Sequence, residues 1–407
     1  MTVEVRPLGV ACNIQCQYCY QNPPRDAGNV PRSYDLDRIK AAVLEEGGDF
    51  SLFGGEPLLV PLPDLEALWA WGFERFGRNG VQTNGSLIGD VHIELFKKYK
   101  VQVGISIDGP GPLNDTRWAG TLARTREATA RTEGAIERLC AEGMPPSLIV
   151  TLHRGNATAA TLPVLQSWIR HVGELGVTSV RLHILETESA EVRERYALSP
   201  DENLSAFLSF AQFESELSTL RFDVFADMRR LLRGQDDSVT CIWGACDPYT
   251  TRAVRGVEGN GQRSNCGRTY KEGVEFAKAE RPGFERYLAL YHTPHAQGGC
   301  QDCRFFLMCK GECPGTAIEG DWRNRTVDCA VWLGLFEYLE AEMVSAGEMP
   351  LSQSSLRTAI EARMLELWAR GENPGVANVL PRLDTNGKPP AGESPHGDYH
   401  GDHTDSR

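Results

Sequence analysis

Apolar and polar positions alternate along the first half of the chain in a way that predicts strands separated by helices. Short apolar runs at residues 3–5, 51–53, 81–83, 101–107, 147–152 and 179–185 predict strands. Helical periodicity predicts helices at 35–46, 64–76, 90–99, 123–142 and 162–175. This order is typical of βαβ units around a parallel sheet. About six units fall short of the eight in a closed TIM barrel, so we expect an α/β fold with a partial (β/α)6 TIM-like barrel.

Three cysteines lie close together after the first expected strand. Cys12, Cys16 and Cys19 follow a Cys-x3-Cys-x2-Cys pattern. Three thiolates in one loop can hold three corners of a 4Fe-4S cube, which leaves the fourth iron open to a small chelating ligand. The alternative is a zinc knuckle, which needs four closed ligands and usually arranges them as paired Cys-x2-Cys units.

Composition narrows the class of protein. The chain has 407 residues, of which 41% are hydrophobic, and a formal net charge of -13. This balance argues against a general nucleic-acid-binding surface, which needs clustered Lys and Arg. No run approaches a membrane span, and no secretion signal is visible. We therefore expect a cytoplasmic protein with no membrane or nucleic-acid partner, whose twelve cysteines are mostly thiolate ligands rather than disulfides.

Residues at the carboxyl ends of parallel strands are the first candidates for a site, because ligands gather there. The second strand ends in Gly54, Gly55 and Glu56. Paired glycines let a backbone approach a ligand closely, and Glu56 could take an ammonium group. The same residues taken alone are equally compatible with a plain turn.

The next strand ends add further polar residues. Asn84 ends the third strand, although with the following glycine it could form only a turn. Ser106 and Asp108 lie at the end of the fourth strand. Arg154 follows the fifth strand, where it could pair with a carboxylate or simply be solvated.

Eight more cysteines follow after the strand and helix rhythm breaks beyond Gly234. They are Cys241, Cys246, Cys266, Cys300, Cys303, Cys309, Cys313 and Cys329. Eight thiolates are enough for two fully ligated 4Fe-4S clusters. Spacing alone admits many partitions, and a zinc ribbon between Cys300 and Cys313 is the alternative.

These motifs together resemble the radical S-adenosylmethionine (SAM) superfamily, and within it the enzymes with a C-terminal iron-sulfur (SPASM) domain. The resemblance covers about residues 2–347. It implies three 4Fe-4S clusters, one of which binds SAM through Cys12, Cys16 and Cys19. Matching by order, it assigns the first auxiliary cluster to Cys241, Cys246, Cys266 and Cys313. It assigns the second to Cys300, Cys303, Cys309 and Cys329, and it implies that both carry electrons.

The resemblance also implies SAM contacts at the strand ends and in the cysteine loop. These residues are Tyr18, Gly54, Gly55, Glu56, Asn84, Ser106, Asp108 and Arg154. Glu56 would bind the methionine amine, and Ser106 the carboxylate or ribose.

Candidate catalytic residues are fewer. Arg181 and His183 are two positions apart in the sixth strand and share a face, so with Glu186 they are candidate cavity residues. Cys140 falls outside every ligand spacing. It is a candidate hydrogen donor, although a buried small hydrophobic residue is the alternative.

We expect four segments along the chain. Residues 1–235 form the partial barrel, 236–347 the SPASM domain, and 348–371 a C-terminal helix. Residues 372–407 are rich in His, Gly, Asp and Pro and are expected to be a flexible tail, since they cannot bury enough apolar surface. Metal binding by the tail histidines, and a tail that mimics a substrate, are the alternatives.

The resemblance implies an oxidoreductase that uses a 5′-deoxyadenosyl radical to take hydrogen from an unactivated carbon. We expect a maturase of a ribosomally made peptide that oxidises side chains or forms thioether or carbon–carbon crosslinks. Because Cys12 comes so early, we expect the peptide to be recognised by the barrel mouth, by the auxiliary domain or by a separate partner protein. An external flavodoxin or ferredoxin is the expected electron donor.

Three alternatives remain open. Anaerobic sulfatase-maturing enzymes share the early start and the eight auxiliary cysteines, but they have an acidic base directly after the third auxiliary cysteine, where this chain has Gly267. Small-molecule dehydrogenation or epimerisation is a second possibility. The third is an electron-transfer protein without enzymatic activity, in which the strand-end residues would be idle.

Overall fold

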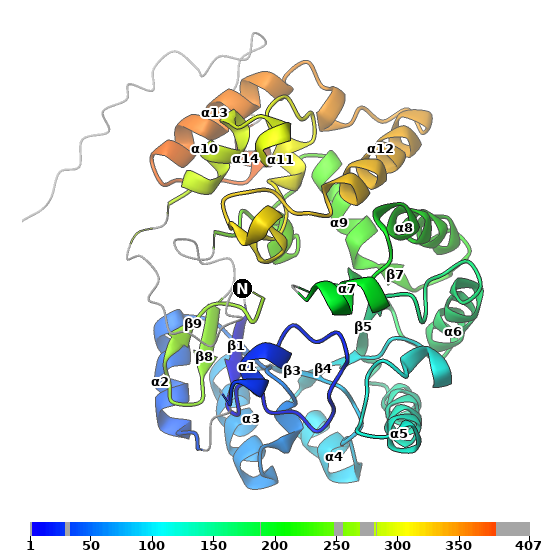
Figure 1. The fold of residues 1–407 in the computed structure, drawn as a ribbon. Coiled ribbons are helices and arrows are strands. Elements are labelled where there is room, and N and C mark those ends of the chain that lie inside the picture. Colours follow the sequence, from blue (N-terminus) through cyan, green and yellow to red (C-terminus); the bar gives the residue numbers. More distant parts are fainter. Residues whose placement is uncertain are drawn as a thin grey trace, which may run out of the picture.

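The computed structural model describes residues 2–28, 33–187, 189–247, 255–268, 281 and 283–379, and its centre is a single open sheet (Figure 1). Six parallel strands neighbour one another in chain order. They are β1 (Val3–Arg6), β2 (Phe50–Leu52), β3 (Asn79–Thr83), β4 (Val101–Ser106), β5 (Ser147–Leu152) and β6 (Ser179–Ile184). The sheet does not close, which confirms the expected partial barrel.

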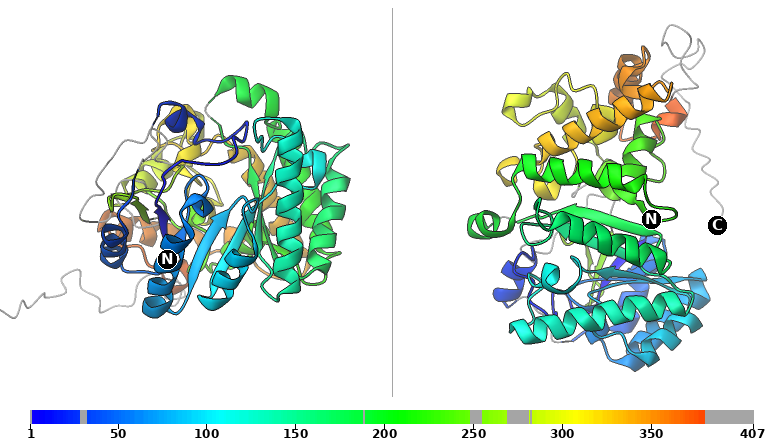
Figure 2. Two further views of the ribbon diagram at one scale, coloured as in Figure 1. Left: turned by 90° about the horizontal axis from the view of Figure 1, so that it is seen from below. Right: turned by 90° about the vertical axis from the view of Figure 1, so that its right-hand side faces the viewer.

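Five helices connect these strands and lie around the outside of the curved sheet (Figure 2). They are α2 (Leu36–Glu46), α3 (Leu62–Phe76), α4 (Asp90–Lys98), α5 (Leu122–Ala141) and α6 (Leu162–Glu174). A short helix, α1 (Asn22–Asp26), follows the cysteine loop. Local chemistry fixes the helix ends: the Asp35 side chain accepts from the amides of Asp37 and Arg38. Gly47 then ends α2 with a φ of 71°, a conformation that glycine adopts without strain.

The two faces of the sheet differ in chemistry. Apolar side chains at alternate positions, such as Val5, Leu52 and Val150, are fully buried in the hydrophobic core. The intervening positions carry polar or small residues and line cavities inside the barrel. Examples are Ser51, Gly80, Gln82, Gln102, Gly104, Ser106, Ser147, Thr151, Arg181 and His183. The inner face is therefore open and polar, unlike the packed interior of a closed TIM barrel.

The sheet is longer than the sequence pattern predicts. The short strand β7 (Arg221–Phe222) pairs parallel with β6 at one edge. At the other edge β8 (Arg255–Glu258) pairs parallel with β1, and β9 (Arg263–Ser264) pairs antiparallel with β8. The second half of the chain thus completes the sheet of the first half.

The remaining helices form the upper part of the molecule in Figure 1 and its junction with the barrel. They are α7 (Ala190–Tyr196), α8 (Pro200–Glu214), α9 (Asp223–Leu232), α10 (Glu285–His292), α11 (Phe306–Cys309), α12 (Cys329–Ser345), α13 (Arg357–Ala369) and α14 (Val376–Val379). The C-terminal helix predicted from residue 348 begins only at Arg357, because a 3-10 turn follows Pro350 and Ser354 has an extended conformation. Residues 380–407 of the expected tail lie outside the described residues.

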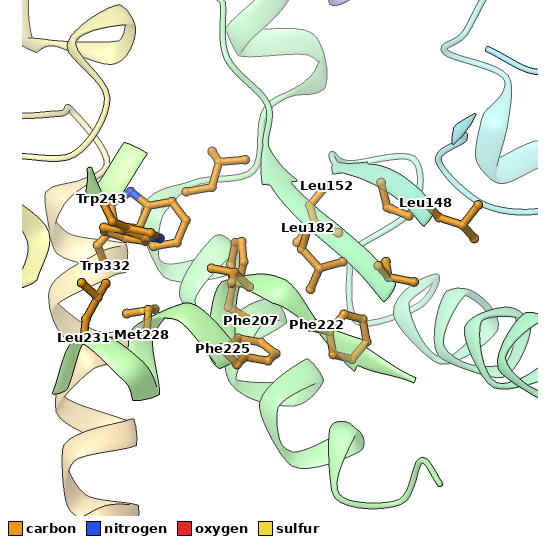
Figure 3. Packing of buried hydrophobic residues seen from close by; sticks show 14 of the residues in the cluster. Leu148, Leu152, Leu182, Phe207, Phe222, Phe225, Met228, Leu231, Trp243 and Trp332 are labelled. Carbon is orange, nitrogen blue, oxygen red and sulfur yellow. The ribbon is translucent and has the colours of Figure 1, made fainter. Parts of the chain in front are cut away.

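An aromatic core joins the two halves (Figure 3). Phe207 on α8 lies edge-on to Phe225 on α9 and to Trp332 on α12, with centroid distances of 6.4 Å and 5.4 Å. Trp332 in turn contacts Trp243 at 5.6 Å. Burial of side chains this large is a major source of stability. The barrel and the part of the chain after residue 235, which we call the auxiliary part, are therefore expected to unfold together.

One buried guanidinium shapes the auxiliary part. Arg286 on α10 is 1% exposed, and its guanidinium donates to main-chain oxygens. These five hydrogen bonds go to the backbone carbonyls of Lys310, Gly311, Glu312, Trp322 and Asn324. The charge thereby holds the loop between Cys309 and Cys313 against the following loop. Among the described residues, no helix is long and apolar enough to cross a bilayer.

Candidate active site

A cavity of about 310 Å³ lies at the carboxyl ends of the strands, between the cysteine loop and the second half of the chain. Many of the predicted site residues line it. They are Cys12, Cys16, Tyr18, Cys19, Gly54, Gly55, Asn84, Ser106, His183, Glu186, Cys241, Cys246, Cys266 and Cys313. Residues predicted from distant parts of the sequence are thus brought to one place.

The cysteine loop is held by backbone hydrogen bonds from the segment after β4. Gln15 N donates to Trp118 O at 2.6 Å, and Gln17 N donates to Thr116 O at 2.8 Å. Asn84 at the end of β3 also donates to the Asn13 side chain at 2.8 Å. The loop therefore has a fixed shape set by other elements rather than by its own sequence.

The paired glycines meet the cysteine loop itself. A Cβ on Gly54 would lie 2.4 Å from Gly9 O, and one on Gly55 would lie 2.1 Å from Ala11 O. Both distances are far below a van der Waals contact, so only glycine fits. In the structure these glycines allow a close approach of the protein's own backbone at Gly9 and Ala11. Their predicted contact with SAM stays a prediction.

Glu56 is buried between the ends of β2 and β3, where its carboxylate has protein partners, and its contact with the methionine amine stays a prediction. Its side chain is 1% exposed and is not among the described residues that line the cavity. Oε1 accepts from Leu58 N at 3.0 Å and from the Thr83 hydroxyl at 2.7 Å, and Oε2 accepts from Asn84 N at 2.8 Å. The carboxylate thus fastens the end of β2 to the end of β3.

Asp108 also lies behind the wall rather than in it. This carboxylate is fully buried, and it accepts from the Tyr18 hydroxyl and from Thr151 N at 3.0 Å. Arg117 Nη1 is 3.7 Å away, and His153 Nε2 is 3.5 Å away. Burial alone would raise the pKa of Asp108, but the Arg117 charge and the hydrogen bonds from His153 and Tyr18 outweigh it and lower that pKa.

The basic residue of the cavity differs from the predicted one. The exposed Arg154 donates to Ala197 O at 2.7 Å and is not among the described residues that line the cavity. Arg117, largely buried, lines it instead and donates to Tyr18 Oη at 3.0 Å. Nothing in the sequence around Arg117 marks it, because its position depends on how the segment after β4 folds back over the cysteine loop.

A second basic residue faces the cavity from the other side. Arg268 Nη1 lies 3.0 Å from Glu186 Oε1, and its Nη2 donates to His183 Nδ1 at 2.8 Å. Since an arginine can only donate, the His183 ring accepts at Nδ1 and carries its proton on Nε2. Burial, with the charges of Arg268 and Arg181, lowers the pKa of His183 well below its usual value, so the ring is neutral.

All twelve cysteines are free thiols, and eleven of them gather in three sets. In the loop, burial raises the pKa of Cys16 to about 12, with Arg117 opposing and the Cys19 and Cys12 thiolates adding to the rise. Cys12 and Cys19 have pKa values that are shifted upward by burial as well. Three adjacent thiols with raised pKa values are a ligand set that ionises when a metal supplies the counter-charge.

The eight later cysteines form two further sets. Burial raises the pKa of Cys246 well above its usual value, and the thiolates of Cys266, Cys241 and Cys313 raise it further. For the pKa of Cys309 the corresponding neighbours are Cys300, Cys329 and Cys303. These are the two sets that the resemblance implies, and the ligation itself stays a prediction.

The three sets suit iron-sulfur clusters by their chemistry. Each is made of cysteine thiols, most of them partly or fully buried, and thiolates are the usual ligands of 4Fe-4S cubes. Within the part of the chain that is described, no three His, Cys, Asp or Glu side chains form a group that could hold a single metal ion.

Cys140 is not brought to the cavity. It lies near the end of α5, partly buried and packed against the hydrophobic core. It is not among the described residues that line the cavity. Cys140 thus has the surroundings of the alternative, a small residue packed in the core, and its role as hydrogen donor stays a prediction.

Replacing Asp108 tests the buried network. Asp108→Asn removes the negative charge beside Arg117 and leaves that cation buried and unpaired. We expect the free energy of unfolding to fall by about 3 kcal/mol or more, as measured by urea denaturation of the metal-free protein. Asp115→Asn is the matched control, because its pair with Arg126 lies on the surface and is worth less than about 1 kcal/mol. Equal effects of the two substitutions would contradict this assignment.

The neutral state of His183 predicts a dependence of stability on pH. Below about pH 6.5 the unfolded chain protonates this histidine while the folded protein does not, because its folded pKa is lowered. Stability contributed by His183 is therefore present above pH 6.5 and lost as the pH falls. We expect the stability difference between the native protein and His183→Gln to shrink by up to about 1.4 kcal/mol per pH unit between pH 6.5 and 5. A constant difference across this range would show that His183 is charged when folded.

Comparisons with known proteins agree with this geometry. Residues 7–157 match the family model described as the radical SAM superfamily. A serine-type anaerobic sulfatase-maturating enzyme of Klebsiella aerogenes is 30% identical over 213 residues, which is 49% of this chain and 50% of that protein. A cysteine-type enzyme of Clostridium perfringens is 30% identical over 129 residues, 28% of this chain and 35% of the relative. The chain thus spans about half the length, or less, of these two curated relatives.

Solved structures share the fold over more of the chain. The structure of native anSMEcpe with bound AdoMet and Cp18Cys peptide has a TM-score of 0.65 and 18% identity, covering 85% of this chain and 98% of that one. Streptococcus suis SuiB bound to S-adenosylmethionine has a TM-score of 0.54 and 14% identity, covering 81% and 77%. Residues 7–157 therefore match a radical SAM domain, and the chain shares its fold with the solved anSMEcpe and SuiB structures.

Proposed function

We propose that this protein is a radical SAM oxidoreductase that oxidises or crosslinks side chains of a ribosomally made peptide. One observation carries the proposal: a single cavity is lined by the three-cysteine loop and by Cys241, Cys246, Cys266 and Cys313. A substrate held there lies between the place where a radical is made and a place where an electron can be accepted. That arrangement suits a reaction whose product has lost two electrons.

The residues of the loop side bind and orient the cofactor. Cys12, Cys16 and Cys19 would hold the SAM-binding cluster, which with SAM supplies a hydrogen-abstracting 5′-deoxyadenosyl radical. The remaining two sets of four cysteines would hold two electron-accepting clusters. Arg117, in the cavity wall, is placed to pair with the SAM carboxylate, the role expected of Arg154. Asn84 and Ser106 offer amide and hydroxyl groups from the ends of β3 and β4.

The wall opposite the three-cysteine loop contains the residues that we expect to accept the proton lost by the substrate. Glu186 and Glu4 are the carboxylates among the described residues that line the cavity, and Glu4 is paired with Arg6 at 3.7 Å. Of the two, Glu186 lies just beyond the carboxyl end of β6, whereas Glu4 lies within β1, so we assign the substrate proton to Glu186. His183 keeps Arg268 in place by accepting its second hydrogen bond. Oxidation then sends a hydrogen atom toward the loop side and a proton to Glu186.

A peptide substrate is supported by the solved relatives. One anSMEcpe structure has a bound Cp18Cys peptide, and one SuiB structure is bound to the precursor peptide SuiA. The cavity here opens between the barrel and the auxiliary part, where an extended chain could enter. We expect an external flavodoxin or ferredoxin to supply the electron, and the peptide to be recognised by the barrel mouth, by the auxiliary domain or by a separate partner protein.

Sulfatase maturation is the second candidate, favoured by the 30% identity to the Klebsiella aerogenes enzyme. The position after Cys266 argues against it. A Cβ on Gly267 would lie 2.9 Å from Tyr20 Oη and 3.2 Å from Gln21 Nε2, so an acidic side chain has little room there. Glu186 would have to replace the base that sulfatase-maturing enzymes carry after the third auxiliary cysteine.

Cofactor content and SAM cleavage test the proposal. We expect the anaerobically reconstituted protein to hold about twelve irons, from three four-iron clusters. Incubation with SAM and a strong reductant should release 5′-deoxyadenosine. Cys16→Ala should abolish this release, whereas Cys303→Ala should lower the iron content and leave uncoupled SAM cleavage in place. Zinc near the protein concentration without iron, or iron without 5′-deoxyadenosine, would overturn the proposal.

Peptide products distinguish the two candidates. A sulfatase-derived peptide that gains an aldehyde would support sulfatase maturation. Loss of two hydrogens with a new bond between side chains, in a peptide encoded beside this gene, would support crosslinking. In either case Glu186→Gln should slow substrate oxidation by about 10²-fold or more, while 5′-deoxyadenosine release without peptide is unchanged.

A further inference from the structure

We call the cavity lined by the three-cysteine loop, described above, the reaction cavity. A second and larger cavity lies below it, at the amino ends of the strands. Its volume is about 700 Å³. Its walls come from the inner face of β1 to β5 and from segments of the second half of the chain. Six residues line both cavities: Glu4, Phe53, Gln82, Arg181, Thr240 and Cys241. The two spaces therefore meet inside the barrel, and we call the second one the lower cavity.

The inner face of the sheet explains why this space is open. Closed TIM barrels fill their interior with layers of bulky branched side chains. Here the corresponding positions are Ser51, Gly80, Gln102, Gly104 and Ser147. A Cβ on Gly104 would lie 2.2 Å from Gln82 Oε1, so glycine at this position gives the Gln82 side chain its space. The interior of this barrel is therefore a polar space rather than a packed apolar core, and it buries less apolar surface than a closed barrel does.

Most of the charged side chains of the lower cavity are paired with residues in its walls or just behind them. Arg78 pairs with Asp49, and Arg181 pairs with Asp223. Lys310 Nζ lies 3.3 Å from Asp236 Oδ2. What the walls offer a ligand is mainly neutral hydroxyl and amide groups, such as Ser51, Ser147, Gln102 and Asn373, together with apolar patches. Such a mixture of donors and acceptors suits polypeptide main chain better than a phosphate or another strongly charged ligand.

We propose that the lower cavity binds an extended segment of the substrate peptide adjoining the residue that is modified. This inference rests on the proposed peptide substrate and deepens it. The substrate enters between the barrel and the auxiliary part, places its target residue in the reaction cavity, and continues past Gln82 and Arg181 into the lower cavity. The enzyme thereby selects internal residues of a chain over terminal ones.

The test uses a plug of the lower cavity that leaves the reaction cavity intact. Gln102 is exposed on the inner face of β4 and lines only the lower of the two cavities. Gln102→Trp fills the space, and Gln102→Ala is the matched control that does not. Ser147→Phe, at the first residue of β5, is a second plug. Val91→Trp adds the same ring on the outer surface, at a side chain that is 50% exposed.

Peptides are found by selecting a random library of twenty-residue sequences for modification by the reconstituted enzyme with SAM and reductant. The best peptide is then shortened from each end. We expect both plugs to raise the KM of the long peptide by about tenfold or more. The KM of the peptide lacking the segment on one side should not change, nor should peptide-independent release of 5′-deoxyadenosine. Gln102→Ala and Val91→Trp should behave as the native enzyme.

The outcomes separate the two proposals. If no library peptide is modified although 5′-deoxyadenosine is released, the peptide substrate is wrong and this inference falls with it. If peptides are modified but the plugs leave the KM of the long peptide unchanged, only the inference is wrong, and the lower cavity is a space for water. Equal losses for long and shortened peptides would also contradict it.

Discussion

The buried carboxylate of Asp108 is the constraint on which the candidate site depends. It lies at the end of β4, where no water reaches it, and it holds Tyr18 of the cysteine loop, the backbone of Thr151 at the end of β5, and Arg117. A buried charge persists only if its partners are all present. The shape of the cysteine loop is therefore linked to the sheet beneath it.

Much of the fold could be predicted because its signals are local. Short apolar runs marked the six strands within one or two residues, and thiol spacing marked the loop of Cys12, Cys16 and Cys19. The division of the eight later cysteines into two sets came from the resemblance rather than from their spacing. The added strands β8 and β9 could not be predicted, because they form through long-range pairing, β8 with β1 and β9 with β8, outside the regular alternation of strands and helices. The same limit applied to the site. Motifs located Gly54, Asn84 and Ser106, but whether a polar residue faces the cavity or braces its wall depends on packing.

Glu56 and Arg117 illustrate that packing, rather than the sequence motif, decides which polar residue faces the cavity. Both are polar residues that follow strands, and the sequence favoured the first as a ligand and ignored the second. In the folded protein the amides of Leu58 and Asn84 and the Thr83 hydroxyl engage both oxygens of the Glu56 carboxylate. Arg117 reaches the cavity only because the segment around Trp118 pairs with the cysteine loop. Long-range hydrogen bonds of this kind leave no trace in a single sequence.

The contribution of β8 and β9 to the barrel sheet has a consequence for engineering. These strands lie in the segment that carries the auxiliary cysteines, and Cys266 follows β9 by two residues. An exchange of auxiliary halves between related enzymes at residue 235 would remove the neighbour of β1 and expose a sheet edge of unpaired backbone groups. A working chimera must either keep residues 255–264 with the barrel or transfer β1 together with them. The two halves are thus interwoven in a way that limits modular exchange, although their cysteine sets look separable along the sequence.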